Sequence, residues 1–175
     1  MSQSDRAALL EGLAHIAASP RDDGTVEMIV RRPSVDGREV VITAQVEPGH
    51  GLQGDSWGAR PHPSPAAEIT LMNARCIALV AGDVDRWPLA GDQLYVDLDL
   101  SVANLPAASR LRIGTALLEV SDKPHTGCSK FSARFGAHAH AFVNSDEGKA
   151  MRLRGMNCRV VEAGVVRTGD RIAKA

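Results

Sequence analysis

Hydrophobic residues near the start of the chain recur at the spacings of a helix that buries one face. Asp5 is a suitable N-cap for this helix, and Ser19-Pro20 ends the pattern. The sequence therefore predicts an amphipathic helix over residues 5–18. Its apolar positions are Leu9, Leu10, Leu13 and Ile16.

From residue 25 onward the hydrophobic period is two, which is the period of strands that bury one face. This alternation covers residues 25–31 and 40–46, which an Asp-Gly turn joins, and it is clearest over 94–102, where one face is apolar and the other is acidic. The apolar phase shifts after Gly114, which predicts a bulge or bend in a strand over 111–120. The other strand patterns are 68–71, 157–166 and 171–173, the last two around Gly169-Asp170.

Three further segments complete the expected fold. Residues 47–67 break all periodicity, and such long stretches inside compact domains are often functional. Residues 72–80 fit either a buried helix or a continued strand, whereas 128–135 and 137–144 are typical of two short helices split by Gly136. The count favours a mainly β barrel with a few helices. We expect an N-terminal helix within residues 1–20 and a single barrel domain over residues 21–175.

Composition is that of a soluble globular protein, because 44% of the 175 residues are hydrophobic and 23% are charged. A domain of this size buries roughly 70% of the surface of its unfolded chain, which is enough for a core without disulfides or metals. No apolar run approaches the roughly 20 residues of a membrane-spanning helix. The start, Met1–Asp5, lacks the pattern of a secretory signal. We therefore expect a cytoplasmic protein with no membrane partner.

The net charge of −1 hides an uneven distribution along the chain. Residues 1–122 hold 10 basic and 17 acidic residues, and residues 123–175 hold 10 basic and 4 acidic residues. This basic last third is either a solvated surface or a site for an anion such as phosphate or carboxylate. Nucleic acid is not the expected anion, because aromatic platforms are scarce there. The arginines considered for such a site are Arg152, Arg154, Arg159 and Arg167.

The three cysteines, Cys76, Cys128 and Cys158, form an odd set without Cys-x-x-Cys spacing, which argues against a disulfide framework and a zinc knuckle. Cys76 lies in an apolar run and is expected to be a buried, inert thiol. Cys158 opens a strand pattern, so a role for its thiol as the resolving or partner cysteine stays open.

Cys128 lies in the segment with the most chemistry, Lys123 to Phe131. Thr126 can cap a helix that begins at about residue 127 or 128, which places Cys128 in the first helical turn. There the free N–H groups, together with positive charge from His125 and Lys130, lower the pKa of a thiol. The resulting thiolate is both a nucleophile and a ligand for soft metals.

Several motifs in order along the chain together resemble the MOSC domain, the family named for the C-terminus of molybdenum-cofactor sulfurase. The segment around Cys128 resembles the cysteine segment of these domains, and the match extends over roughly residues 45–172. The motifs are His125-Thr126-Gly127-Cys128-Ser129-Lys130-Phe131, Gly51-Leu52-Gln53-Gly54-Asp55, Ile69-Thr70-Leu71, Asp99-Leu100-Ser101 with Asn104-Leu105, and Val165-Val166-Arg167 with Gly169-Asp170. The chain departs from the pattern at Ser56-Trp57, which follow the glycine-aspartate pair, and at Gln93-Leu94, where Glu-Asn-Leu is absent.

The resemblance implies a MOSC-type β-barrel that handles sulfur or the molybdenum cofactor. Cys128 inherits the role of a persulfide carrier or of a molybdenum ligand, and the partners implied are a cysteine desulfurase, which brings an association with pyridoxal phosphate, or an acceptor molybdenum enzyme. If the protein is an enzyme, it is a molybdenum-cofactor-dependent oxidoreductase or a sulfurtransferase. The cofactor expected is a molybdenum pterin, bound by Gly54, Asp55, Thr70, His125, Thr126, Lys130 and Arg154.

Two alternatives from other classes stay open. One is a metal-binding module built from His125, Cys128, His138 and His140, although a two-residue step on a helix points two rings about 200° apart. The other is a barrel that binds an anion or a partner without catalysis.

Overall fold

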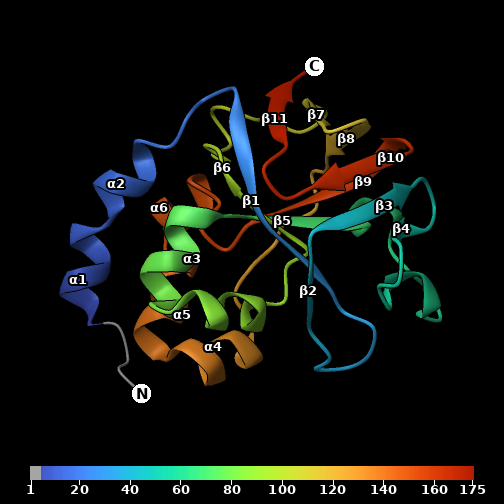
Figure 1. Ribbon diagram of the computed structural model, residues 1–175. Coiled ribbons are helices and arrows are strands. Elements are labelled where there is room, and N and C mark those ends of the chain that lie inside the picture. Colours follow the sequence, from blue (N-terminus) through green and yellow to red (C-terminus); the bar gives the residue numbers. More distant parts are fainter. Residues whose placement is uncertain (1–4) are drawn as a thin grey trace.

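Seven strands form a closed barrel within residues 5–175, which are the residues that the computed structural model describes (Figure 1). Residues 1–4, on which the expectations about the N-terminal segment and the secretory signal partly rest, lie outside the described residues. The strands run in the order β11-β7-β8-β9-β5-β6-β1, and antiparallel pairing of β1 with β11 closes the ring. The mainly β barrel is thereby confirmed. Its strands are β1 (Gly24–Arg31), β5 (Ile69–Asn73), β6 (Leu94–Asp97), β7 (Arg110–Ile113), β8 (Ala116–Val120), β9 (Met156–Glu162) and β11 (Arg171–Lys174).

Three predicted strands are divided in the structure. The segment 40–46 becomes β2 (Glu39–Val41), which pairs with β1, and β3 (Thr43–Glu47), which joins a small second sheet with β4 (Gly51–Leu52) and β10 (Gly164–Arg167). The segment 157–166 likewise divides into β9 and β10. The segment 111–120 is the third and divides into β7 and β8. The predicted bend after Gly114 is therefore wrong, because Gly114 has φ +54 and forms the turn of the hairpin between these two strands.

Six helices of the described residues gather on one side of the barrel, as Figure 1 shows. The predicted helix 5–18 is present but is divided at Gly12, and Asp5 caps its start as expected, accepting from the N–H of Ala7. Residues 72–80 mostly form a helix because Asn73 ends β5 and caps it. The helices are α1 (Arg6–Glu11), α2 (Leu13–Ala17), α3 (Ala74–Ala81), α4 (Ser129–Phe135), α5 (Ala137–Asn144) and α6 (Asp146–Ala150).

Two hydrophobic cores hold these layers together, one inside the barrel and one between the barrel and the helices. Tyr95 belongs to the second core and is fully buried, although the alternation over 94–102 places it on the acidic face. The helices cover this face of β6, so the strand is buried on both sides, and the Tyr95 hydroxyl donates to the carbonyl oxygen of Trp87 at 2.8 Å. No helix within residues 5–175 is long and apolar enough to cross a membrane.

Candidate functional site

Cys128 lies on the surface, at the N-cap of α4 and one position before the first helical turn in which it was expected. The residue before it, Gly127, is held through both its N–H and its carbonyl oxygen. The N–H of Gly127 donates to Asn144 Oδ1 at 2.9 Å, and its carbonyl oxygen contacts His140 Nε2 at 3.0 Å. Because α5 supplies both partners, it holds the backbone just before the exposed thiol in one place.

The surroundings of Cys128 favour its thiolate. Partial burial opposes ionisation, but the backbone N–H groups of Phe131 and Lys130 and the positive charge of Arg154 outweigh it, so the pKa of Cys128 is lowered. The other two thiols behave in the opposite way, because burial raises the pKa of Cys76 and of Cys158 to about 12. The protein therefore has one thiol suited to nucleophilic chemistry or metal ligation.

This difference predicts selective alkylation. Iodoacetamide at neutral pH is expected to add one carbamidomethyl group, at Cys128, at a rate about a hundredfold or more above that of the buried thiols. Since the pKa of Cys128 is lowered, its rate should rise with pH around a midpoint below that of free cysteine. Intact mass and peptide mapping measure this, with Cys128→Ser as the variant that must stay unmodified. Equal modification of Cys76 in the folded protein would contradict the assignment.

Behind Cys128, a buried carboxylate organises two of the predicted site residues. Asp92 is fully buried and lies in the loop that directly precedes β6. Its Oδ1 is 2.8 Å from His125 Nε2, and its Oδ2 accepts from Arg154 Nη1 at 2.6 Å. Arg154 also donates to the carbonyl oxygen of Ala90 and lies 5.0 Å above the ring of Phe131 in α4. Asp92 thus ties the His125 segment and Arg154 to the base of the helix that carries Cys128.

The protonation state of Asp92 fixes which nitrogen of the His125 ring donates to it. Burial opposes ionisation of Asp92, but the charges of Arg154 and His125 and their hydrogen bonds outweigh it and lower its pKa to about 2. An ionised carboxylate only accepts hydrogen bonds, so His125 Nε2 must carry a proton. In the neutral ring, Nδ1 is then an acceptor.

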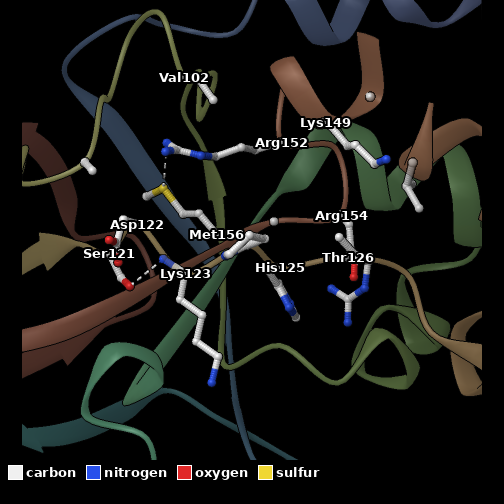
Figure 2. A pocket seen from close by; sticks show the side chains of 15 residues that line it. Val102, Ser121, Asp122, Lys123, His125, Thr126, Lys149, Arg152, Arg154 and Met156 are labelled. Carbon is white, nitrogen blue, oxygen red and sulfur yellow. Dashed lines mark hydrogen bonds between the residues drawn. The ribbon is translucent and has the colours of Figure 1, made fainter. Parts of the chain in front are cut away.

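His125, Thr126 and Arg154 line one pocket, with a volume of about 610 Å³ (Figure 2). Figure 2 shows Met156 between Arg152 on one side and His125 on the other. Arg152 is fixed by donation from Nη1 to the carbonyl oxygens of Leu100 and Leu105. The pocket combines cationic groups with apolar walls, an arrangement suited to a small organic anion. Its apolar lining residues include Val102, Ala107, Pro124, Val143 and Met156.

The other predicted binding residues lie elsewhere. Gly54 and Asp55 line a separate pocket, and the fully buried Asp55 carboxylate forms two hydrogen bonds with the Arg32 guanidinium, at 2.9 and 2.8 Å. Thr70 is buried and bonds to Gln93, whose amide also reaches Asp55 at 3.3 Å. Asp55 and Thr70 therefore brace the loop before β5 against the start of β6.

Only two of the four arginines considered for one anion site come together. Arg152 and Arg154 both line the pocket described above, whereas Arg159, which pairs with Glu119 at 2.6 Å, and Arg167 do not line it. The proposed metal cluster is not assembled either: within residues 5–175 no group of three or more histidine, cysteine or acidic side chains is placed to hold a metal.

Asp92 and Gln93 are the site residues that sequence reasoning missed. The sequence did carry a signal for them, because two polar residues directly precede the apolar residues of β6. The structure shows that both of these polar residues are completely buried. A buried acidic residue just before a strand requires a cationic partner. Its position in the sequence does not identify which of the 20 lysines and arginines is that partner.

Comparison with known families agrees with this geometry. The family profile described as MOSC domain matches residues 59–173. The chain belongs to the MOSC domain family. This agrees with the sequence motifs, which predicted a MOSC-type barrel and a family cysteine segment around Cys128.

Solved structures show the same MOSC fold at low identity. The YuaD protein of Bacillus subtilis has a TM-score of 0.63 and 19% identity, over 85% of this chain and 93% of that one. YiiM of Geobacillus stearothermophilus has a TM-score of 0.60 and 15% identity, over 87% and 75%. YiiM of Escherichia coli has a TM-score of 0.53 and 19% identity, over 86% and 69%. A search of curated protein sequences found no match.

Proposed function

We propose that this MOSC protein transfers sulfur through a persulfide on Cys128. The observation that carries the proposal is the contrast among its thiols: Cys128 is exposed with a lowered pKa, whereas Cys76 and Cys158 are buried with raised pKa values. A carrier needs one accessible thiolate and no second thiol that would close a disulfide with it.

The proposed step is a thiol exchange at a sulfane sulfur. The Cys128 thiolate attacks the terminal sulfur of a persulfide on a donor such as a cysteine desulfurase. A sulfur–sulfur bond forms at Cys128 while the donor's sulfur–sulfur bond breaks, and the donor cysteine leaves as a thiolate. Attack by an acceptor nucleophile then removes the same sulfur and restores the Cys128 thiolate. Neither exchange needs an external oxidant or reductant.

The residues around Cys128 support this exchange without entering it. Arg154 and the N–H groups of Lys130 and Phe131 stabilise negative charge on the sulfur, both in the starting thiolate and in the persulfide anion. The pocket beside Thr126 supplies room of about 610 Å³ for an acceptor with an anionic group. His125, which contacts Asp92 through Nε2, also lines this pocket.

A second role, ligation of molybdenum in a pterin cofactor, is favoured by the same exposed thiolate. Soft thiolate suits molybdenum, and the residues present fit an anionic cofactor, because cationic side chains line the pocket next to Thr126 and the buried Arg154 Nε has no hydrogen-bond partner among the described residues. Cys128 would hold the metal, with Thr126, His125, Lys130 and Arg154 around it. When bound, the group would supply two-electron reduction of an oxidised substrate.

One experiment separates the two roles. The purified protein is incubated with a cysteine desulfurase and cysteine, and intact mass is measured before and after reduction. The carrier role predicts a reducible gain of one sulfur atom on Cys128, lost in Cys128→Ala and kept in the matched variant Cys76→Ala. The ligand role instead predicts molybdenum and pterin bound to protein from cofactor-producing cells, lost in Cys128→Ala. Absence of both sulfur gain and bound molybdenum would reject the proposal.

A further inference from the structure

Two side chains of α5 hold the peptide group that joins Gly127 to Cys128. Asn144 Nδ2 donates to the Gly127 carbonyl oxygen at 3.1 Å, and His140 Nε2 lies 3.0 Å from the same oxygen. The N–H of Gly127 in turn donates to Asn144 Oδ1 at 2.9 Å. The Asn144 amide therefore bonds to both polar atoms of Gly127, as a paired residue in an antiparallel sheet does. We call Asn144 and His140 the α5 clamp.

The contacts of the α5 clamp also assign the proton on His140. Its Nε2 faces a carbonyl oxygen, which only accepts hydrogen bonds, so Nε2 carries the proton. Asn144 Nδ2 lies 3.1 Å from this nitrogen and donates to the same oxygen. Two donors thus converge on the carbonyl oxygen of Gly127.

The Asn144 side chain is not used to end its own helix. Ser145, the next residue, has a hydroxyl that donates to the Phe142 carbonyl oxygen at 2.8 Å and accepts from the N–H of Gly148 at the start of α6. Within residues 5–175, the side-chain amide of Asn144 contacts only Gly127 and His140 through its polar atoms. Ser145 therefore serves the helix ends, and Asn144 serves the segment before Cys128.

Gly127 allows α5 to approach this segment closely. A Cβ at residue 127 would lie 3.0 Å from Asn144 Nδ2, 3.1 Å from Val143 Cγ2 and 3.3 Å from His140 Cδ2. These distances are shorter than ordinary van der Waals contacts, so a side chain there would push α5 away from the segment. The glycine is therefore needed for space at the point where the α5 clamp acts.

The clamped peptide group carries one of the donors that stabilise the thiolate. The N–H of Cys128 belongs to the same peptide group as the Gly127 carbonyl, and it acts on the sulfur together with the N–H groups of Lys130 and Phe131. Donors to a carbonyl oxygen polarise the N–H of that peptide group and make it a stronger donor. On its other side, the Cys128 carbonyl oxygen accepts from the N–H of Ser132 at 3.1 Å. Thus α5 fixes one peptide group of Cys128 and α4 fixes the other.

We infer that Asn144 and His140 are positioning residues for Cys128, which keep its N–H turned toward its own sulfur and so keep the thiol reactive. Without them the peptide group after Gly127 is free to rotate, because glycine restricts the backbone least, and the N–H can turn to solvent. The inference rests on the proposed function, in which Cys128 is the reacting group. Both residues act through the backbone and take no part in the exchange itself.

The pH dependence of Cys128 alkylation by iodoacetamide tests the α5 clamp. In Asn144→Ala and His140→Ala the midpoint should rise by up to about one pH unit, because the thiolate loses support. Below both midpoints the rate should fall about threefold, since a tenfold loss of thiolate is partly offset by its higher nucleophilicity. His140→Gln should restore the midpoint, because the glutamine amide is an uncharged donor of similar reach.

Asn157→Ala is the matched control for a general loss of stability. Asn157 is buried, and its Nδ2 donates to the carbonyl oxygens of Lys123 at 3.0 Å and Pro124 at 3.2 Å, in the same connection but before Gly127. This variant should lower the melting temperature and leave the alkylation midpoint unchanged. The inference is overturned if Asn144→Ala keeps the wild-type midpoint, or if Asn157→Ala shifts it equally. If Asn144→Ala does not fold, the two His140 variants decide, and equal midpoints for alanine and glutamine overturn the inference.

Sulfur uptake from a cysteine desulfurase separates this inference from the proposed function. Uptake should slow in Asn144→Ala together with the rise in the alkylation midpoint. If the wild type gains no sulfur but the midpoint still rises in the variant, the proposed function fails and the α5 clamp stands. If both proteins gain sulfur at the same rate with the same midpoint, the proposed function stands and the α5 clamp fails.

Discussion

Replacing Asp92 with alanine is expected to lower the free energy of unfolding by about 3–5 kcal/mol, because it leaves a buried cation without its partner. Arg154 is almost completely buried, and Asp92 is its only acidic contact among the described residues. His125 loses its hydrogen-bonded partner in the same variant. Urea unfolding followed by circular dichroism measures the change, and a loss below about 1 kcal/mol would contradict the assigned role.

The double variant Asp92→Ala/Arg154→Met provides the matched control. Removing both charges leaves no uncompensated ion, and methionine keeps most of the apolar volume of arginine, so this variant should be more stable than Asp92→Ala alone. Simple addition of the two single losses would show that the residues do not act as a pair.

Acid should weaken the same interaction. Since folding lowers the pKa of Asp92 from its ordinary value near 3.8 to about 2, its contribution is complete above pH of about 4 and is lost as the pH falls toward about 2. The wild type should therefore lose stability over this window. In Asp92→Asn the loss over the same window should be smaller.

Gly155→Ala is expected to cost about 3–5 kcal/mol, because two penalties add at this position. Gly155 has φ +112, a conformation that other residues rarely adopt, and a Cβ there would lie 2.3 Å from the carbonyl oxygen of Leu71 and 3.1 Å from His125 Cδ2. The clash lies where β9 begins its pairing with β5. Thermal and urea unfolding measure the loss.

Gly169→Ala separates the two penalties. Gly169 also has a positive φ, +89, but a Cβ there would have nothing within 4 Å. Only backbone strain remains, so the expected loss is about 1 kcal/mol. Similar losses in both variants would mean that the approach of Gly155 to β5 is looser than the structure has it.

The parts of the fold predicted from sequence are those set by local patterns. Gly136 divides α4 from α5 where expected, and Asp5 caps α1, because helix periodicity and capping depend on neighbouring residues. Tyr95 and the division at Ile42 were missed. Burial of Tyr95 depends on a helical layer built from distant segments, and β3 leaves the barrel in order to pair with β10.

In the candidate site too, residues marked by their sequence neighbours were predicted, and residues that depend on distant partners were missed. Cys128 stood out because its glycine and polar neighbours do not resemble a core run, and the structure places it on the surface. Asp92 did not stand out, since its partners His125 and Arg154 come from other parts of the chain. The uneven charge along the sequence is redistributed by folding, so the cationic surfaces had to be found in three dimensions.

Closure of the barrel also has a consequence for how the protein acquires its structure. Gly24 and Ile172 are neighbours in the sheet, so β1 lacks one of its partners until residues 171–174 have left the ribosome. Contacts this distant in sequence are slow to form and leave strand edges unpaired in the meantime. During synthesis the start of β1, at Gly24 and Thr25, therefore keeps an open edge until β11 is made, whereas β2 can already cover Ile29–Arg31.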